Sequence, residues 1–323
     1  MAETPGSPTL VVVAIVLIVI GAGLAAGYVY LKNRPAGPTH ELVVEVGDNV
    51  TVNYIGVFGS GPEQGKVFDT SLYTVATNPA AWPKSLQYQP RGTSGNYSPL
   101  AVHVGGSTPS GGYSLGSQSF IQVVTGFWQG LVGLPGNITK SVNVPPALGY
   151  GPLDPACQIV RPLTQTFPIY QTLTRSAFGS KFPGVLPNTG ASLLDPLYRW
   201  PVLILSANST SVAIENLATV GSSASPFGFP EEVTNVTSTA NGTGSITVVA
   251  ELTPSEAGHL LGNDQSGKSP CSTSQTNGKF IVTAVDLVHG TYTVDYDSEV
   301  TGQTLIFIVE VVNIFVPVAA PTA

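Results

Sequence analysis

Residues 123–136 read VVTGFWQGLVGLPG. Two β-branched residues lead into a Thr-Gly step, two adjacent aromatic residues open a short apolar stretch, and Pro-Gly closes it. This pattern predicts a short helix over residues 127–134. The Phe127–Trp128 pair at its first turn either fills a small core or forms the floor of a pocket, and the surrounding sequence decides between the two.

Short strand signals flank this stretch. Val50, Val52 and Tyr54 alternate with polar residues, which predicts a strand with one buried face. Further strands are predicted over residues 99–105 and 138–144. The strongest strand signal is TLIFIVEVVNI, residues 304–314, in which alternate apolar residues, Phe307 among them, share one face.

A long block, residues 153–299, separates the last of these strands from the others. It has strand patterns of its own, at 202–205, 211–215, 245–252, 280–288 and 291–296, and no repeat of fixed period is visible. Its length suits a separate domain inserted into the first. We therefore expect a discontinuous domain over 41–152 and 300–315, an insert over 153–299, and a C-terminal tail over 316–323.

The composition excludes several classes of function. Charged residues make up only 10% and the net charge is −7, with no cluster of Lys or Arg, so nucleic acid is not an expected partner. The four histidines are widely spread and lack the spacing of metal ligands. No nucleophile elbow, phosphate-binding loop or dinucleotide fingerprint is present. We expect neither a metal nor a cofactor.

Residues 9–31 carry no charge over 23 positions. About 20 apolar residues cross a bilayer, so this run predicts a single-pass transmembrane helix between an N-terminal tail, 1–8, and a linker, 32–40. A cleaved signal peptide is the alternative, although no Lys or Arg precedes the run. We expect a cell-membrane protein that contacts the membrane through residues 9–31.

The sequence also bears on which side of the membrane the main body of the protein lies. Lys32 and Arg34 favour a cytoplasmic body. Six Asn-x-Ser/Thr sequons, an even number of cysteines and a surface rich in Ser, Thr and Gly favour an extracytoplasmic one, which we expect. The sequons begin at Asn49, Asn96, Asn137, Asn208, Asn235 and Asn241. Cys157 and Cys271 are expected to pair and so to join two ends of the insert.

Six motifs occur in an order that resembles the FKBP-type peptidyl-prolyl cis-trans isomerases. They are GDNVTVNYIGVF (47–58), GKVFDTS (65–71), PLAVHVG (99–105), VVTGFWQGLVGL (123–134), PPALGYG (145–151) and TLIFIVEVV (304–312). The middle block resembles the insert-in-flap chaperone domain of the long archaeal and bacterial members, on residues 182–190, 199–216 and 292–305. The resemblance implies an α+β, mostly β fold: an antiparallel sheet that wraps a short helix, with an inserted all-β-rich domain and one N-terminal transmembrane helix.

The resemblance also implies an apolar cup that receives the substrate proline. Its catalytic residues would include Phe127 as the floor, Asp69 at the rim, and the Val124 backbone N–H and Tyr150 hydroxyl as donors to substrate carbonyls. The remaining wall residues would be Tyr54, Phe68, Val123 and Phe307, with Leu100 binding substrate in place of an aromatic residue. The stretch 70–98 is longer than the usual loop of the family and either covers this site or extends it.

The implied function is peptidyl-prolyl isomerase and folding chaperone, with proline-containing unfolded polypeptides as partners. Each cup residue also has a packing alternative, since rings on strands fill any β core and Asp69 could cap a turn. Two functional alternatives stay open: a non-catalytic protein of the same fold that binds clients or partners, and a structural envelope protein. The enzymatic reading fails if the Phe127 ring is sealed under neighbouring side chains with no opening beside the Tyr150 hydroxyl.

Overall fold

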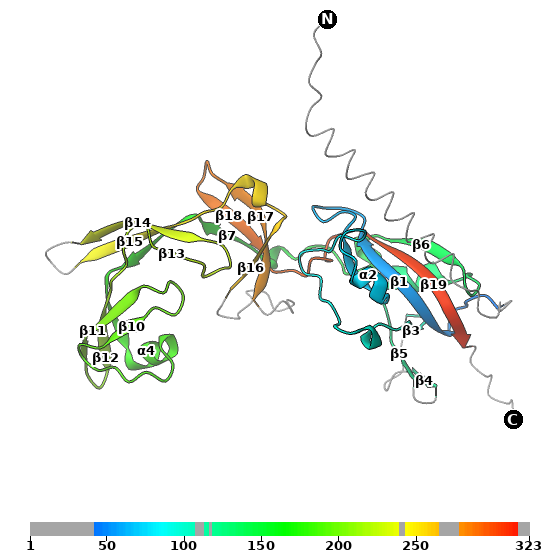
Figure 1. Ribbon diagram of the computed structural model, residues 1–323, viewed down its shortest axis with the longest axis horizontal. Coiled ribbons are helices and arrows are strands. Elements are labelled where there is room, and N and C mark those ends of the chain that lie inside the picture. The colour runs from blue at the N-terminus through cyan, green and yellow to red at the C-terminus, as the bar shows by residue number, and fades with distance from the viewer. Residues whose placement is uncertain (1–41, 107–112, 116–117, 239–242, 265–277, 316–323) are drawn as a thin grey trace, which may run out of the picture. The chain divides into compact units, whose positions relative to one another are not determined.

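The computed structural model describes residues 42–106, 113–115, 118–238, 243–264 and 278–315. The chain divides into two compact units. Unit 1 comprises Met1–Leu153 and Glu299–Ala323, and unit 2 comprises Asp154–Ser298. Each unit has its own hydrophobic cores, and the two are described separately below (Figure 1).

Unit 1 is built on a five-stranded antiparallel sheet of order β2-β1-β19-β6, with β3 also paired to β1. Its two long strands, β1 and β19, lie side by side (Figure 1) and are rich in the β-branched and aromatic residues that favour strands. The strands are β1 (Asn49–Phe58), β2 (Val67–Thr70), β3 (Leu100–His103), β6 (Thr139–Val144) and β19 (Leu305–Phe315).

Helix α3 (Thr125–Leu131) packs on one face of this sheet, and it begins two residues before the predicted start at 127. Gly126 and Gly130 lie about one turn apart and face β6. A Cβ atom on Gly130 would come within 2.2 Å of the Val142 side chain, and one on Gly126 within 2.7 Å of Val144. The two glycines therefore let the helix approach β6 closely.

The other face of the sheet is covered by the segment that follows β2. This segment contains α2 (Tyr73–Ala76), and Leu72, Val75 and Trp82 from it are buried in a second cluster with Ile55 and Ile308. The loop over 70–98 therefore covers a sheet face and supplies a core to it. Neither outcome was evident from its turn-rich sequence.

Because both faces of the sheet are covered, β1 is buried on both sides along most of its length. The prediction of one buried face was wrong: Thr51 is 5% exposed and Asn53 is 2% exposed. These polar side chains are tolerated because the Asn53 amide donates to Glu310 at 3.0 Å and the Asn313 amide donates to Thr51 at 3.0 Å.

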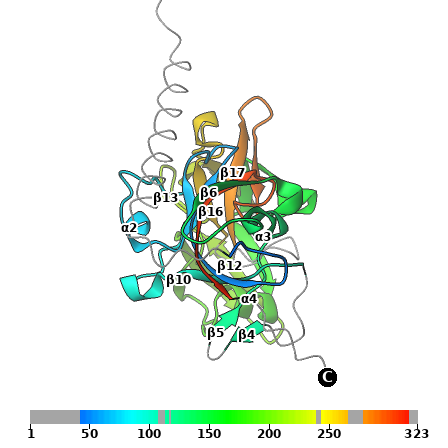
Figure 2. The same cartoon turned by 90° about the vertical axis from the view of Figure 1, so that its right-hand side faces the viewer.

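The remaining elements of unit 1 are short. Strands β4 (Tyr113–Leu115) and β5 (Gln118–Phe120) form a hairpin, whose two strands lie side by side in Figure 2. Ile121, just after the hairpin, bridges to Val102 of β3, so the hairpin lies beside β3 (Figure 1). Two 3-10 turns, η1 (Ser94–Asn96) and η2 (Pro146–Leu148), complete the described part.

Unit 2 consists of three four-stranded antiparallel sheets with one common plan. In each, a three-stranded meander pairs through its last strand with one strand from the segment 158–174. The sheets have the orders β10-β11-β12-β9, β13-β14-β15-β8 and β16-β17-β18-β7. Strand β7, the first of this segment, pairs with the last meander, and β9, the third, pairs with the first meander. The three sheets are therefore nested in the order of the chain.

The strand bounds show which predictions missed. Five strands of unit 2 match predicted ones. They are β11 (Pro201–Ala207, predicted 202–205), β12 (Ser211–Asn216, predicted 211–215), β15 (Gly244–Ala250, predicted 245–252), β17 (Lys279–Asp286, predicted 280–288) and β18 (Thr291–Asp295, predicted 291–296). The strands without a prediction are β7 (Gln158–Pro162), β8 (Thr164–Pro168), β9 (Tyr170–Thr174), β10 (Ser192–Leu194), β13 (Ser223–Ala224), β14 (Glu231–Ser238) and β16 (Leu260–Asn263). Many of these carry Pro or polar residues and lie at sheet edges.

Helix α4 (Arg175–Lys181) and two short turns, η3 (Pro155–Cys157) and η4 (Pro254–Glu256), connect the strands of unit 2. Two hydrophobic clusters stabilise the unit, one beneath β17 and β18 and the other between α4, β11, β12 and β15. Cys157 is fully buried in the first cluster and is disulfide-bonded. Its expected partner, Cys271, lies outside the described residues.

The expected fold class requires correction. The described residues are mostly β, with several separate antiparallel sheets, and their longest helices, α3 and α4, have seven residues each. Among the residues that the structure describes, no helix is both long enough and apolar enough to cross a lipid bilayer. The transmembrane prediction followed from an apolar run alone, and that run, residues 9–31, lies outside the described residues.

Glu231 on β14 gives a testable pH dependence. Its side chain is 1% exposed, and burial raises the pKa of this carboxyl above its ordinary value of 4.5, against the lowering effects of Tyr198 and Arg161. The folded state therefore binds this proton more tightly than the unfolded state. The free energy of unfolding then falls as pH rises from the ordinary pKa through the raised one.

Glu231→Gln should raise the unfolding midpoint of unit 2 at neutral pH and flatten its fall as pH rises above the ordinary pKa of 4.5, because an amide has no proton to lose. Thermal unfolding followed by circular dichroism measures both effects. Glu232→Gln, at the next residue of β14, is the matched control. Equal slopes for the wild-type chain and Glu231→Gln would contradict the prediction.

Candidate functional site

Four of the predicted cup residues form a cluster of aromatic rings on the face of the unit 1 sheet that α3 covers. Phe307 lies at its centre, with ring centroids 4.8 Å from Phe127, 5.5 Å from Phe68 and 6.3 Å from Tyr54. The Phe127 and Phe68 rings meet Phe307 edge to face, at 89° and 88°. Edge-to-face contacts are favourable because the ring edge is positive and the face negative.

The position of Phe68 depends on a glycine and a β-bulge. Strand β2 pairs Asp69 with Gly56 and Val67 with Val57, which leaves Phe68 as an extra residue. The Phe68 ring lies over Gly56, where a Cβ atom would be only 2.6 Å from it. Through the bulge, the adjacent side chains of Phe68 and Asp69 both reach the ring cluster, although neighbours on a regular strand point to opposite faces.

Arg91 completes a polar group at the edge of the ring cluster. One nitrogen, Nη2, donates to the Tyr54 hydroxyl and to Asp69 Oδ1, each at 2.7 Å, and the Tyr54 hydroxyl donates to Asp69 Oδ2. Arg91 is itself held by the loop: its backbone N–H donates to the Tyr97 hydroxyl at 2.8 Å, and its guanidinium lies 5.8 Å from the Tyr97 ring centre. The three side chains form one charge-balanced network.

The two tyrosines of the site are held in the neutral form. Burial raises the pKa of Tyr54 well above its ordinary value, and the Asp69 carboxylate raises it further. Burial and Asp69 also raise the pKa of Tyr150. Both hydroxyls therefore keep their protons at neutral pH; the Tyr54 hydroxyl donates its proton to Asp69, and the Tyr150 hydroxyl is available to donate to a ligand.

The two predicted carbonyl-binding donors make no hydrogen bond within the described residues. Val124 is the N-cap of α3, and its backbone N–H has no acceptor. Tyr150 lies just after η2 and is 50% exposed. Its hydroxyl has no hydrogen-bond partner among the described residues either, so both groups can donate to a ligand.

The exposure of the cup residues is uneven. Tyr54, Phe127 and Phe307 are only 4%, 2% and 5% exposed, so the Phe127 ring is nearly covered. The walls above them, Phe68, Leu100, Val123 and Val124, are partly exposed and pack against the same cluster. A ligand would therefore meet these walls and Tyr150 before it met Phe127.

Trp128, the second residue of the aromatic pair, follows Phe127 in the first turn of α3. It is partly buried and packs against the same apolar core, and its Nε1 atom is buried with no hydrogen-bond partner. Phe127 and Trp128 therefore contribute to the same side of the sheet.

Sequence reasoning missed Arg91. No local pattern marks it, because it lies in the irregular stretch 85–98 and reaches Asp69 only through the folded loop.

The described residues can also be compared with the requirements of a metal site, which needs several converging ligands. No group of three or more His, Cys, Asp or Glu side chains there converges on a position that could hold a metal ion.

Comparison of the sequence with protein-family models and with curated proteins finds no match.

Proposed function

We propose that unit 1 is a peptidyl-prolyl cis-trans isomerase of the FKBP type. The observation that carries this proposal is the ring cluster of Phe127, Phe307 and Tyr54 together with two donors, the Val124 N–H and the Tyr150 hydroxyl, that have no partner among the described residues. Four of the six motifs that resemble this family carry the rings of the cluster, and the other two carry Leu100 of its wall and Tyr150.

The reaction needs no nucleophile. Rotation about a peptide bond meets a barrier of about 18–20 kcal/mol because the planar amide is stabilised by resonance. The twisted amide has lost that resonance and is less dipolar, so transfer from water to an apolar wall disfavours it less than the planar form. An apolar wall of rings and aliphatic side chains therefore lowers the barrier relative to water.

The residues of the site have separate roles in this scheme. Phe68, Leu100 and Val123 provide the apolar wall for the proline ring, with Phe127 and Phe307 as the base beneath it. The Val124 N–H and the Tyr150 hydroxyl hold substrate carbonyls while the imide turns. The Asp69–Arg91 pair with Tyr54 keeps the rim rigid and charge-balanced.

The test is a proline-isomerisation assay on the full chain with a proline-containing peptide. Tyr150→Phe removes one hydrogen-bond donor and leaves the ring, so kcat/KM should fall by about two- to tenfold, the effect of one net hydrogen bond. Tyr170→Phe, the same change in unit 2, should leave the rate unaltered. A wild-type chain that does not accelerate isomerisation over the solvent rate would refute the proposal.

A second candidate function is favoured by one observation, the near-complete burial of Phe127. If the floor does not open, the same fold binds polypeptides without turning the imide. In that case a proline peptide binds unit 1, and Tyr150→Phe weakens binding, but no acceleration of isomerisation occurs. The two functions are therefore separated by one assay of rate and one of binding.

Unit 2 is proposed to hold unfolded client chains. Large apolar side chains are exposed around the β10-β11-β12-β9 sheet: Leu186, Leu194, Leu197, Leu205, Leu217 and Val220 are between 38% and 77% exposed. Exposed apolar groups in such numbers suit contacts with polypeptides. The disulfide-bonded state of Cys157 supports the proposal that both units act in an oxidising compartment outside the cytoplasm.

A further inference from the structure

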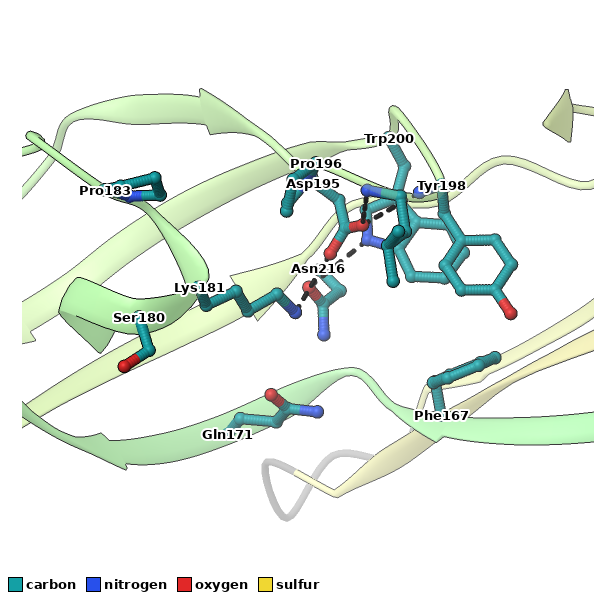
Figure 3. A pocket seen from close by; sticks show the side chains of 11 residues that line it. Phe167, Gln171, Ser180, Lys181, Pro183, Asp195, Pro196, Tyr198, Trp200 and Asn216 are labelled. Carbon is teal, nitrogen blue, oxygen red and sulfur yellow. Dashed lines mark hydrogen bonds and ion pairs between the residues drawn. The ribbon is translucent and has the colours of Figure 1, made fainter. Parts of the chain in front are cut away.

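Unit 2 contains a pocket of about 450 Å³ that none of the preceding functions uses. It lies where the loop 195–200 meets α4, β8 and β9. Figure 3 shows Phe167 and Gln171 on one side of the pocket and Lys181, Asp195 and Asn216 on the other. A volume of this size suits a small ligand or one residue of a chain with its flanking peptide groups.

The pocket is walled at one end by aromatic rings. Tyr198 and Trp200 stack with their ring planes 8° apart and centroids 4.7 Å apart, and Phe167 lies 4.8 Å from Tyr198. Leu197, which is 38% exposed, adds an apolar side chain to the lining. A ligand with an aromatic ring would gain both apolar burial and ring contacts at this end.

The loop that carries these rings is held in a single shape. Asp195 Oδ1 accepts from the backbone N–H groups of Leu197 and Tyr198, each at 2.9 Å, and the Asp195 N–H donates to Trp200 at 2.8 Å. Between the two rings, Arg199 has φ of 63°, a conformation that residues with a Cβ atom adopt rarely. Such backbone strain persists where the surrounding contacts enforce it, often at binding sites.

The charges in the pocket exclude an anion as the main ligand. The Lys181 ammonium lies 2.9 Å from Asp195 Oδ2, and the Asp195 side chain is only 3% exposed. The pair is neutral as a whole, so a ligand carboxylate or phosphate would bring an uncompensated negative charge close to a buried one. Lys181 can still donate its other N–H groups to a neutral acceptor such as a carbonyl.

The neutral polar groups point to an amide. Both polar atoms of the Asn216 side chain already have a partner: its Oδ1 accepts from Trp200 Nε1 at 3.3 Å, and its Nδ2 donates to the Pro168 carbonyl at 2.9 Å. The side chain of Gln171 on β9 has no hydrogen-bond partner within the described residues. Its side-chain amide has both a donor and an acceptor, which is the complement of a peptide group.

We propose that this pocket binds an aromatic residue of an extended polypeptide, with the ring against Phe167, Tyr198 and Leu197 and the adjacent peptide group hydrogen-bonded to Gln171 and Lys181. A sugar fits less well, because Trp200 is 5% exposed and offers no open ring face for stacking. The inference rests on the proposed client-holding role of unit 2 and names the residue class that unit 2 selects.

The experiment titrates the full chain with N-acetyltyrosinamide and follows the NMR signals of the Gln171 side-chain amide and the Trp200 indole. Saturable shifts of both signals are expected. Gln171→Leu should weaken binding by about two- to tenfold, the effect of one net hydrogen bond. Thr172→Leu introduces the same side chain at the next residue of β9, where the strand faces the other way, and should leave binding unchanged.

Leu197→Asp is a second variant at an exposed position and should abolish the shifts, because it places a carboxylate beside the ring site. The inference is overturned if N-acetyltyrosine binds more tightly than the amide, if methyl glucoside produces the same shifts, or if N-acetyltyrosinamide produces none. Suppression of aggregation of an unfolded protein by the full chain is measured in parallel. If that activity is present while N-acetyltyrosinamide does not bind, the client-holding role stands and the pocket inference fails.

Discussion

Phe307→Ala should lower the free energy of unfolding of unit 1 by about 3–5 kcal/mol, the usual cost of removing a buried Phe side chain. It should also reduce kcat/KM for proline isomerisation by at least about tenfold, equivalent to 1.4 kcal/mol in the barrier. The reason is that Phe307 touches three other rings, so its loss opens the base of the cup to water and leaves Phe68 and Phe127 unsupported. Denaturant unfolding and the isomerisation assay measure the two effects.

Ile308→Ala is the matched control for this change. Ile308 is the next residue of β19, is 4% exposed, and packs in the cluster on the opposite face of the sheet. Its truncation should also destabilise unit 1, by about 2–5 kcal/mol, yet leave the turnover of the folded enzyme close to the wild-type value. If both variants reduced turnover equally at a temperature where both are folded, the ring cluster would have no special role in the reaction.

Arg91→Met should reduce kcat/KM by about tenfold to a hundredfold with little change in stability. Hydrogen bonds to charged groups contribute about 1.5–3 kcal/mol, and this substitution removes the two that Arg91 gives to Tyr54 and Asp69. The Asp69 carboxylate then stands unneutralised beside the Tyr150 hydroxyl and the substrate carbonyls. The ion pair itself is partly exposed, at 32% and 40% for the two side chains, so its contribution to folding is below about 1 kcal/mol.

A double-mutant cycle separates positioning from a general loss of charge. If Arg91 acts through Asp69, Arg91→Met combined with Asp69→Asn should be no slower than the slower single variant, because the two residues act as one unit. Lys140→Met removes an exposed cation elsewhere in unit 1 and should have no effect on the rate. Additive losses in the double variant would show that Arg91 and Asp69 act independently.

The nested plan of unit 2 explains why the sequence predicted only five of its twelve described strands, β7 to β18. Strands β11, β12, β15, β17 and β18 carry alternating apolar residues and pack in the clusters, so their own sequences identify them. Strands β7, β8 and β9 alternate between exposed and half-buried positions and contain Pro162 and Pro168. They are strands because a meander that follows later in the chain offers each of them an edge, and no local pattern contains that information.

The sequence alone determined the existence of the elements whose pattern is local: the strongly apolar β19, strand β1, and the short helix that carries Phe127. Hydrophobic periodicity acts over a few residues, so a single chain reports it directly. The tertiary structure alone decided the bulge that turns Phe68 and Asp69 to the same face, the arrival of Arg91 at Asp69, and the covering of the second sheet face by the 70–98 loop. These depend on contacts between residues far apart in the chain, and their energies arise only once the sheet has formed.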